Sequence, residues 1–313
     1  MFAARLARLC KSAAIPRRTK LCLLTASQKS YLRVIEPPIV QEINSPANSY
    51  IKHCCKLVTS RPYREQAGSV LIVGHIPVQE IAEHTAVRVL FLAQGAPAPA
   101  GVQAETTVQV SAAVLQRLSG LESVGGLQAV AEVDAPAQHD FVANSEEGSV
   151  KRLLALDCVQ DPGNLGTLLR TAAGLGWDGA YLLPGCCDPC NEKALRASRG
   201  AAFKLHLAHG DWEGLDEAVQ CHSLTYVGAE PHEEAQSTAE SSSGSNGTAR
   251  VCLVLGNESQ GLSREACDRC QPLSIPMAGR MESLNVSHAG AILMFALSEM
   301  GPHVLKYARQ FID

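Results

Sequence analysis

The sequence predicts an α/β protein with two units, a smaller one over residues 42–135 and a larger one over residues 151–313. In the larger unit, short apolar runs alternate with helical stretches, which is typical of a doubly wound parallel sheet covered on both faces. A polar, irregular segment over residues 136–150 reads as a linker between the units. A hydrophobic content of 46% in 313 residues is enough for a substantial core, whereas an aromatic content of 4% argues against base stacking as the main mode of binding.

The smaller unit begins with a predicted helix within residues 41–60 and continues as an alternation of strands and helices. Its lead-in is one of the few locally basic stretches outside the first 35 residues, and we interpret it either as an RNA contact or as a solvated helix face. The basic residues of this stretch are Lys52, Lys56, Arg61 and Arg64. The expected elements are a strand over Gly68–Val73, a helix over Val78–His84, a strand over Val87–Leu92, further alternation over Val108–Ser119 and a closing run over Leu127–Val133.

The larger unit alternates more regularly, and a polar, Ser-rich run over residues 233–249 interrupts it as a flexible surface insertion. The predicted strands are Leu153–Asp157, Ala180–Leu183, Phe203–Leu207, Leu224–Gly228 and Val251–Leu255. The predicted helices are Asn164–Leu175, Asn191–Ser198, Trp212–Gln220 and Val286–Met300.

The first 35 residues carry eight basic side chains and no acidic one. This composition predicts an organelle transit peptide for a mitochondrion or a chloroplast, with a basic RNA-binding tail as the alternative. The remaining chain holds 19 basic and 31 acidic residues, a net charge of −12, so any RNA contact must come from a local patch. The longest apolar run near the end, Ala289–Leu297, has nine residues, too few to cross a bilayer, and we expect no membrane partner.

Twelve cysteines raise the question of disulfides or zinc. Two C-x-x-C pairs occur, Cys187/Cys190 and Cys267/Cys270, but they lie 77 positions apart, whereas the pairs of a zinc ribbon are about 15 to 20 residues apart. Without a secretion signal we expect reduced thiols and no metal site.

Gly174, Gly176 and Gly179 match the G-x-G-x-x-G pattern of dinucleotide-binding proteins. That site requires a strand before the glycines and a helix after them, and here the order is inverted. A glycine at a helix C-terminus that supplies a left-handed turn explains Gly174 without a ligand.

Three loops carry unusual residues. The first, Gln160–Asn164, leads from a strand into a helix. On this helix Gly166 is expected to open space, and Arg170, four residues later on the same face, can reach a phosphate or substrate. The alternative for Arg170 is a surface salt bridge. The second, Leu255–Ser263, is a near miss to a phosphate loop because Leu262 replaces the required lysine, and its Glu258 is placed to orient an arginine.

The third loop, Ile275–Ser287, joins a short strand to the last helix. Asn285 or Ser287 is expected to cap that helix. Capping accounts for one polar residue of the loop and leaves the others unexplained.

Together, Asn164-x-Gly166-x3-Arg170, LGNESQGLS and IPMAGRMESLNVSHAGAI resemble the three motifs of the SpoU (TrmH) family of RNA ribose 2′-O-methyltransferases. The match covers residues 153–300 in the right order, and the third motif is highly specific. The lead-in INSPANSYIKHCCKL and the run YREQAGSVLIVG also resemble, more loosely, a small ribosomal-protein-like RNA-binding domain found before many such catalytic domains.

The resemblance implies a deep trefoil knot in the C-terminal domain, a homodimer, S-adenosylmethionine as methyl donor and an RNA substrate. It places Gly256, Ile275 and Leu284 in the cofactor pocket. It also implies that Arg170 is the catalytic residue near the target hydroxyl, acting either as a base or by positioning and electrostatic stabilisation. The remaining active-site positions that it implies are Asn164, Glu258, Ser283 and Asn285.

The leader and the extra N-terminal domain favour organellar large-subunit rRNA as the substrate. A tRNA substrate is one alternative. A noncatalytic RNA-binding or ribosome assembly factor with the same fold is another, although the complete set of motif residues argues against it.

Overall fold

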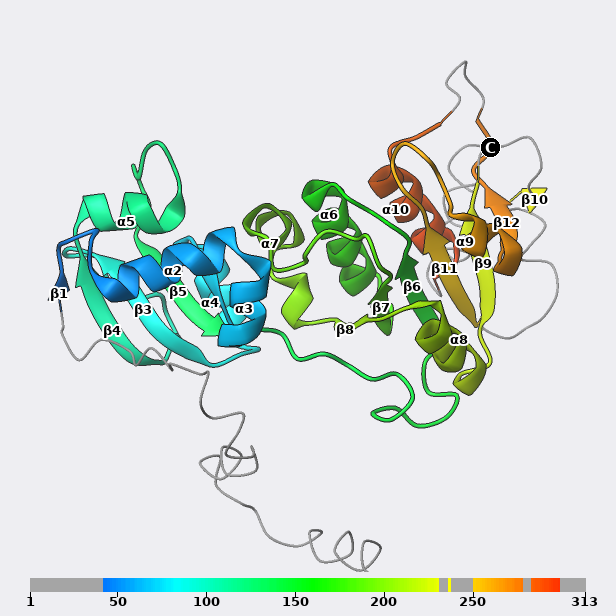
Figure 1. Ribbon diagram of the computed structural model, residues 1–313, viewed down its shortest axis with the longest axis horizontal. Helices are drawn as coiled ribbons and strands as arrows, with labels where there is room; N and C mark the ends of the chain where they lie inside the picture. The colour runs from blue at the N-terminus through cyan, green and yellow to red at the C-terminus, as the bar shows by residue number, and fades with distance from the viewer. Residues whose placement is uncertain (1–41, 231–235, 238–249, 278–282, 299–313) are drawn as a thin grey trace, which may run out of the picture. The chain divides into compact units, whose positions relative to one another are not determined.

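The computed structural model describes residues 42–230, 236–237, 250–277 and 283–298, shown as coloured ribbon in Figure 1. The chain divides into Met1–Glu36 and Pro37–Asp313, and all described residues belong to the second part. The expected transit peptide, most of the insertion at 233–249 and the last positions of the predicted final helix lie outside the described residues.

The residues of the predicted smaller unit form a five-stranded sheet of order β1-β4-β3-β5-β2. Strand β5 is antiparallel to both of its neighbours, and the other pairings are parallel. Helices α2 and α5 contribute to the apolar core on one face, and α4 to the core on the other. The bounds are β1 Glu42–Ile43, α2 Ser49–Thr59, α3 Arg61–Ala67, β2 Ser69–Val73, α4 His75–Ala82, β3 Val87–Ala93, β4 Ala104–Val110, α5 Ala112–Ser119 and β5 Ala129–Asp134.

Short polar residues set the ends of these helices. The side chain of Asn48 accepts a hydrogen bond from the Tyr50 amide at 2.8 Å and starts α2. Helix α3 was not predicted from the sequence. Ser60 caps its beginning, and Gly68 ends it in the left-handed region with φ 61°. Arg64 on α3 is 5% exposed and pairs with Asp188, so the structure contradicts its interpretation as an RNA contact.

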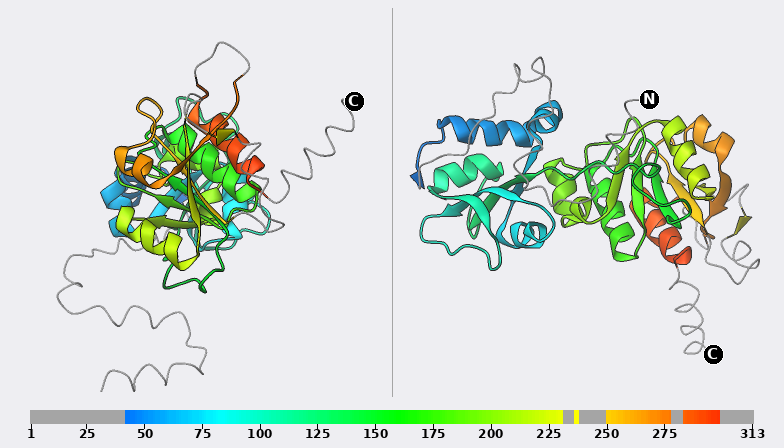
Figure 2. Two further views of the ribbon diagram at one scale, coloured as in Figure 1. Left: turned by 90° about the vertical axis from the view of Figure 1, so that its right-hand side faces the viewer. Right: turned by 90° about the horizontal axis from the view of Figure 1, so that it is seen from below.

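The second sheet has seven strands of order β10-β12-β9-β11-β6-β7-β8, and every pairing is parallel. This arrangement confirms the predicted parallel sheet. Helices α6 and α10 contribute to the core on one face, and α8 and α9 to the core on the other, as the two views of Figure 2 also show. The bounds are β6 Arg152–Leu156, α6 Pro162–Gly174, β7 Gly179–Leu182, α7 Glu192–Ser198, β8 His206–His209, α8 Trp212–Cys221, β9 Thr225–Ala229, β10 Gln236–Ser237, β11 Val251–Leu255, α9 Arg264–Arg269, β12 Gln271–Ser274 and α10 Val286–Ala296.

The strand predicted over Phe203–Leu207 is wrong in position. A short 3-10 helix, η2 (Ala201–Phe203), occupies its beginning, and β8 starts only at His206. The turn follows Gly200, whose φ of 75° suits glycine, and the Leu205 amide donates to the Ala201 carbonyl at 2.9 Å. The apolar residues of this segment are buried although they form a turn, and an apolar sequence alone does not tell a buried turn from a buried strand.

The glycines of the apparent dinucleotide fingerprint end a helix, as predicted. Gly174 is the last residue of α6, but the left-handed conformation belongs to Gly176, with φ 68°. The final helix is shorter than predicted, since α10 ends at Ala296 and Leu297 follows it as the cap.

The described ranges bear on the state of the cysteines, on metal binding and on membrane helices. All ten cysteines in them are free thiols. Over the same ranges, no three or more His, Cys, Asp or Glu side chains are grouped so that they could hold a metal ion, and no helix is long and apolar enough to cross a membrane.

Candidate active site

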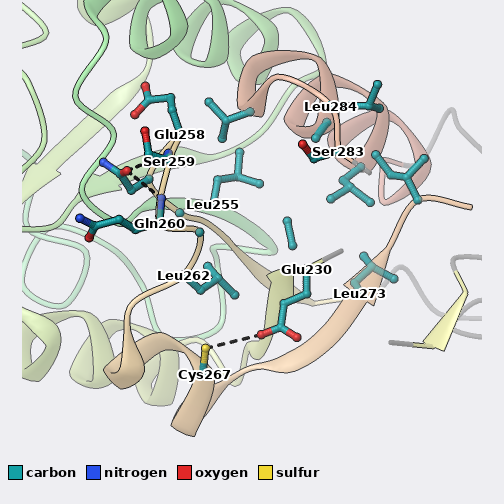
Figure 3. Close-up of a pocket in the computed structure, with 18 of the residues that line it drawn as sticks. Glu230, Leu255, Glu258, Ser259, Gln260, Leu262, Cys267, Leu273, Ser283 and Leu284 are labelled. Atoms are coloured by element: carbon teal, nitrogen blue, oxygen red, sulfur yellow. Dashed lines mark hydrogen bonds between the residues drawn. The ribbon is translucent and has the colours of Figure 1, made fainter. Parts of the chain in front are cut away.

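A cavity of about 490 Å³ lies at the carboxyl ends of three neighbouring strands, β9, β11 and β12 (Figure 3). Because these strands are parallel, the residues that follow them meet at the same edge of the sheet. The wall is largely apolar, with backbone groups from a glycine-containing loop after β11. Its lining includes Ala229, Glu230, Leu255–Leu262, Cys267, Leu273, Ile275, Met277, Ser283, Leu284, Val286, Ala289 and Leu293.

The loop after β11 is held closed by reciprocal backbone hydrogen bonds between Asn257 and Gly261, at 2.8 and 3.0 Å. The Asn257 side-chain oxygen accepts from the Ser259 amide at 2.9 Å, and its Nδ2 donates to the Cys158 carbonyl at 2.9 Å. A Cβ on Gly256 would lie 2.3 Å from the carbonyl carbon and oxygen of Gly261. The tight loop therefore requires glycine at position 256.

Glu258 links this loop to the first turn of α6. Its carboxylate accepts hydrogen bonds from the Asp161 amide at 3.0 Å, the Gln160 amide at 3.3 Å and Asn164 Nδ2 at 3.2 Å. Desolvation raises the pKa of Glu258, but hydrogen bonds to the carboxylate outweigh it, so the pKa lies below its usual range. Two predicted site residues, Asn164 and Glu258, are thus in direct contact. The expectation that Glu258 orients an arginine is not met among the described residues, where its partners are these α6 groups.

Glu258→Gln is expected to weaken this link, because glutamine loses the charge that favours the amides at a helix N-terminus. The carboxylate is exposed and screened by water, so we expect a loss of roughly 0.5–1 kcal/mol in the free energy of unfolding at pH 7. Because the folded pKa is lowered, the contribution is present above the unfolded pKa of about 4.3 and disappears as the pH falls through the folded value. Urea denaturation at pH 7 and pH 4 measures it, with exposed Glu83→Gln as control. An equal effect of both variants at pH 7 would contradict the assignment.

Gly166 behaves differently from the expectation, whereas the expected role of Arg170 stays a prediction. A Cβ on Gly166 would lie 2.5 Å from the Ala194 carbonyl oxygen of α7, so this glycine allows the two helices to pack closely and does not open space for a ligand. Arg170 is exposed, and it makes no hydrogen bond or ion pair with the described residues. The alternative of a surface salt bridge is therefore not found in the described part of the chain, and Arg170 does not line the cavity.

The third loop contributes Ile275, Ser283 and Leu284 to the cavity. Asn285 caps α10, since its Oδ1 accepts from the Ser287 amide at 2.8 Å and from the Ser287 hydroxyl at 2.7 Å. Of the two predicted caps, Asn285 and Ser287, the structure has Asn285. Residues 278–282 of this loop lie outside the described residues.

Comparison with known proteins connects this geometry to a family. Residues 151–295 match the model of the SpoU rRNA Methylase family. A protein of Mycobacterium sp. strain KMS named uncharacterized tRNA/rRNA methyltransferase is 30% identical over 274 residues, which cover 82% of this chain and 85% of the relative. The chain belongs to the SpoU family.

Other SpoU relatives cover different shares of the chain. The 23S rRNA (guanosine(2553)-2′-O)-methyltransferase RlmP of Bacillus subtilis is 31% identical over 48% of this chain, and human mitochondrial rRNA methyltransferase 3 is 24% identical over 80% of it and 72% of the relative. For RlmP and a cyanobacterial relative, the match spans only 58% and 51% of the relative's own length. The crystal structure of the SpoU methyltransferase AviRb from Streptomyces viridochromogenes matches 82% of this chain and 98% of its own, with a TM-score of 0.69 and 25% identity.

The SpoU motifs did not indicate every residue at the cavity. Glu230, after β9, and Cys267, on α9, line it as well. The signal that could have found Glu230 is its position at a strand end. That signal becomes useful only when the strand order, which places β9 beside β11, is known.

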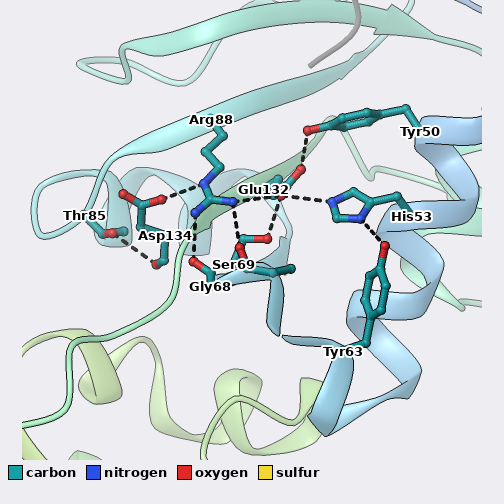
Figure 4. Close-up of polar contacts among 10 residues, drawn as sticks. Tyr50, His53, Tyr63, Gly68, Ser69, Thr85, Arg88, Glu132 and Asp134 are labelled. Atoms are coloured by element: carbon teal, nitrogen blue, oxygen red, sulfur yellow. Dashed lines mark hydrogen bonds and ion pairs between the residues drawn. The ribbon is translucent and has the colours of Figure 1, made fainter. Parts of the chain in front are cut away.

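A second polar cluster in this SpoU protein lies in the five-stranded sheet (Figure 4), and none of its residues lines the cavity. Glu132 on β5 is 1% exposed and accepts hydrogen bonds from Tyr50 at 2.5 Å and Ser69 at 2.6 Å, and His53 Nε2 lies 3.2 Å from it. Desolvation raises the pKa of Glu132. The hydrogen bonds and the electrostatic effect of His53 lower it by more, so the pKa lies below its usual value. The cluster therefore holds a buried carboxylate ionised.

Glu132→Gln is expected to lower the free energy of unfolding at pH 7 by about 2–3 kcal/mol, because the amide leaves buried donors without a full partner. Since the folded pKa is lowered, wild-type stability from this group is present above the unfolded pKa of about 4.3 and is lost as the pH falls through the folded value. Urea titrations at several pH values should show a weaker pH dependence of the free energy of unfolding in Glu132→Gln than in the wild type. Exposed Glu105→Gln is the control. An unchanged pH profile would refute the role of Glu132.

Proposed function

We propose that this protein transfers a methyl group from S-adenosylmethionine to a ribose 2′-hydroxyl of organellar rRNA. The observation that carries the proposal is the cavity at the strand ends, whose loop is joined through Glu258 to Asn164 on α6. Family membership and the name of RlmP support ribose methylation, and the name of the human relative supports an organellar rRNA. The basic, acid-free leader supports the same location.

The cavity suits the cofactor in size and character. Its volume of about 490 Å³ falls within the roughly 300–1,000 Å³ of small-molecule sites, and apolar walls with a few polar groups are typical of them. Gly256, Ile275 and Leu284 would hold the nucleoside and methionine parts. When bound, S-adenosylmethionine supplies an activated methyl group on a sulfonium.

The residues of the chain then have to bring the ribose oxygen into line with that methyl group. Arg170 is exposed and has no partner among the described residues, so its guanidinium is available for a backbone phosphate of RNA. We assign it positioning and electrostatic stabilisation, because arginine remains charged in proteins. The RNA phosphate that Arg170 positions then takes the proton of the 2′-hydroxyl as the oxygen attacks the methyl group. Asn164, Ser283 and Asn285 complete the site around it, and Glu258 orients Asn164.

We further propose the trefoil knot, the homodimer and an RNA-binding role for residues 42–135. Ile292 on α10 is 45% exposed and Leu284 is 39% exposed, so apolar surface near the cavity is available to a second copy. Lys52 and Lys56 are exposed and support RNA contact by α2.

A two-step experiment separates the enzyme from a noncatalytic assembly factor. Calorimetry first measures binding of S-adenosylmethionine to the full chain, and transfer of tritiated methyl to organellar rRNA and tRNA follows. We expect binding and labelling of rRNA. Binding without labelling of either RNA favours the assembly factor, and labelling of tRNA alone favours the tRNA alternative.

A further inference from the structure

Glu230 is a carboxylate at the cavity that the family motifs do not include. It directly follows β9, and its amide donates to the Leu273 carbonyl of β12 at 3.1 Å, which fixes its backbone at the carboxyl end of β9. Its side chain lines the cavity beside Cys267 (Figure 3). The backbone of Glu230 is thus held in place by the sheet, and its carboxylate is accessible to a ligand bound in the cavity.

The two carboxylates at the cavity differ in how well their oxygens are occupied. Glu258 accepts three hydrogen bonds from N–H groups of the segment that begins α6. Glu230 accepts a single hydrogen bond among the described residues, from Cys267 Sγ at 3.5 Å, and a thiol is a weak donor. A carboxylate offers about four acceptor positions, so Glu230 retains most of its capacity for a ligand.

The strand order indicates which ligand group meets Glu230. Strand β9 pairs with β11, and the glycine-containing loop of the cavity follows β11. In dinucleotide-binding α/β proteins, an acidic residue about 20 residues after the glycine loop accepts a hydrogen bond from the ribose 2′-hydroxyl. Glu230 has a comparable place at the end of the strand beside β11, although it precedes the glycine loop in the chain. The two oxygens of a carboxylate match two vicinal hydroxyls in spacing.

We propose that Glu230 binds the 2′- and 3′-hydroxyls of the ribose in the nucleoside part of the cofactor. This inference rests on the proposed function, because it takes S-adenosylmethionine as the ligand of the cavity. Glu230 is thus a cofactor-binding residue remote from the transferred methyl group. The competing partner for its carboxylate is the ammonium group of the methionine part.

Calorimetry on the full chain with 5′-methylthioadenosine and its 2′,3′-dideoxy counterpart tests the proposal, since both lack the amino acid part. For the wild type we expect removal of the hydroxyls to weaken binding about tenfold or more. Glu230→Gln should bind methylthioadenosine about tenfold more weakly than the wild type, and removal of the hydroxyls should cost this variant little more. Glu265→Gln on α9 makes the same change in charge at an exposed position outside the cavity and should match the wild type.

Three outcomes would overturn the proposal. If Glu230→Gln binds methylthioadenosine as the wild type does but S-adenosylmethionine more weakly, the carboxylate serves the ammonium group. If the effects of the substitution and of hydroxyl removal simply add, Glu230 does not contact the hydroxyls. If the wild type binds neither nucleoside nor S-adenosylmethionine, the proposed function fails together with this inference, whereas the first two outcomes leave the proposed function intact.

Discussion

Arg170→Ala is expected to lower the rate of methyl transfer by at least about 100-fold and to leave the affinity for S-adenosylmethionine unchanged. Loss of one preorganised charged donor at a reacting centre typically costs about this much in rate. The affinity should persist because Arg170 is exposed on α6 and does not line the cavity. Single-turnover methyl transfer and calorimetry of the same protein preparation measure the two quantities.

Arg170→Lys separates positioning from base catalysis. A lysine keeps the charge but not the forked geometry, so we expect partial recovery of the rate with the pH–rate profile of the wild type. Near-complete recovery with an unchanged profile would exclude a special arginine base. Loss of cofactor binding in Arg170→Ala would refute the placement of Arg170 outside the cofactor pocket.

Gly256→Ala is expected to weaken cofactor binding at least about tenfold and to lower the free energy of unfolding by about 1–3 kcal/mol. The reason is steric, because the added Cβ would lie 2.3 Å from the Gly261 carbonyl, and backbone atoms on the opposite side of a tight loop cannot move aside without opening it. Calorimetry and urea denaturation measure the two effects.

Gly174→Ala is the matched control for Gly256→Ala. Gly174 ends α6 with an ordinary backbone conformation, and a Cβ there would meet nothing within 4 Å. We expect this variant to bind and unfold like the wild type. If Gly256→Ala also behaved like the wild type, the loop after β11 would be more adaptable than its hydrogen bonds indicate.

The sequence predicted the parallel sheet because short apolar runs, such as β11 (Val251–Leu255), alternate with helical stretches. These runs are continuous because the strands are buried on both faces. It also predicted a cap at Asn285 or Ser287, of which the structure has Asn285, since capping depends on residues close together in the chain. It placed the strand at Phe203–Leu207 wrongly, because an apolar segment can be buried as a turn as well as a strand.

Contacts between distant segments were much harder to predict. The role of Gly166 depends on the close approach of α7, and the burial of Arg64 depends on Asp188, 124 positions away. The contact between Glu258 and Asn164 joins segments 94 residues apart, and the resemblance to a family named both residues without giving their hydrogen bond. Glu230 was missed because its relevance follows from the strand order, which no local pattern encodes.

Mapping of ribose methylation in organellar rRNA, with and without this protein, tests the central claim most directly. The account predicts one or more 2′-O-methylated riboses that disappear when the protein is absent, return with the wild-type chain and stay absent with Arg170→Ala. An unchanged methylation map of rRNA in its absence, or full restoration by Arg170→Ala, would contradict the account.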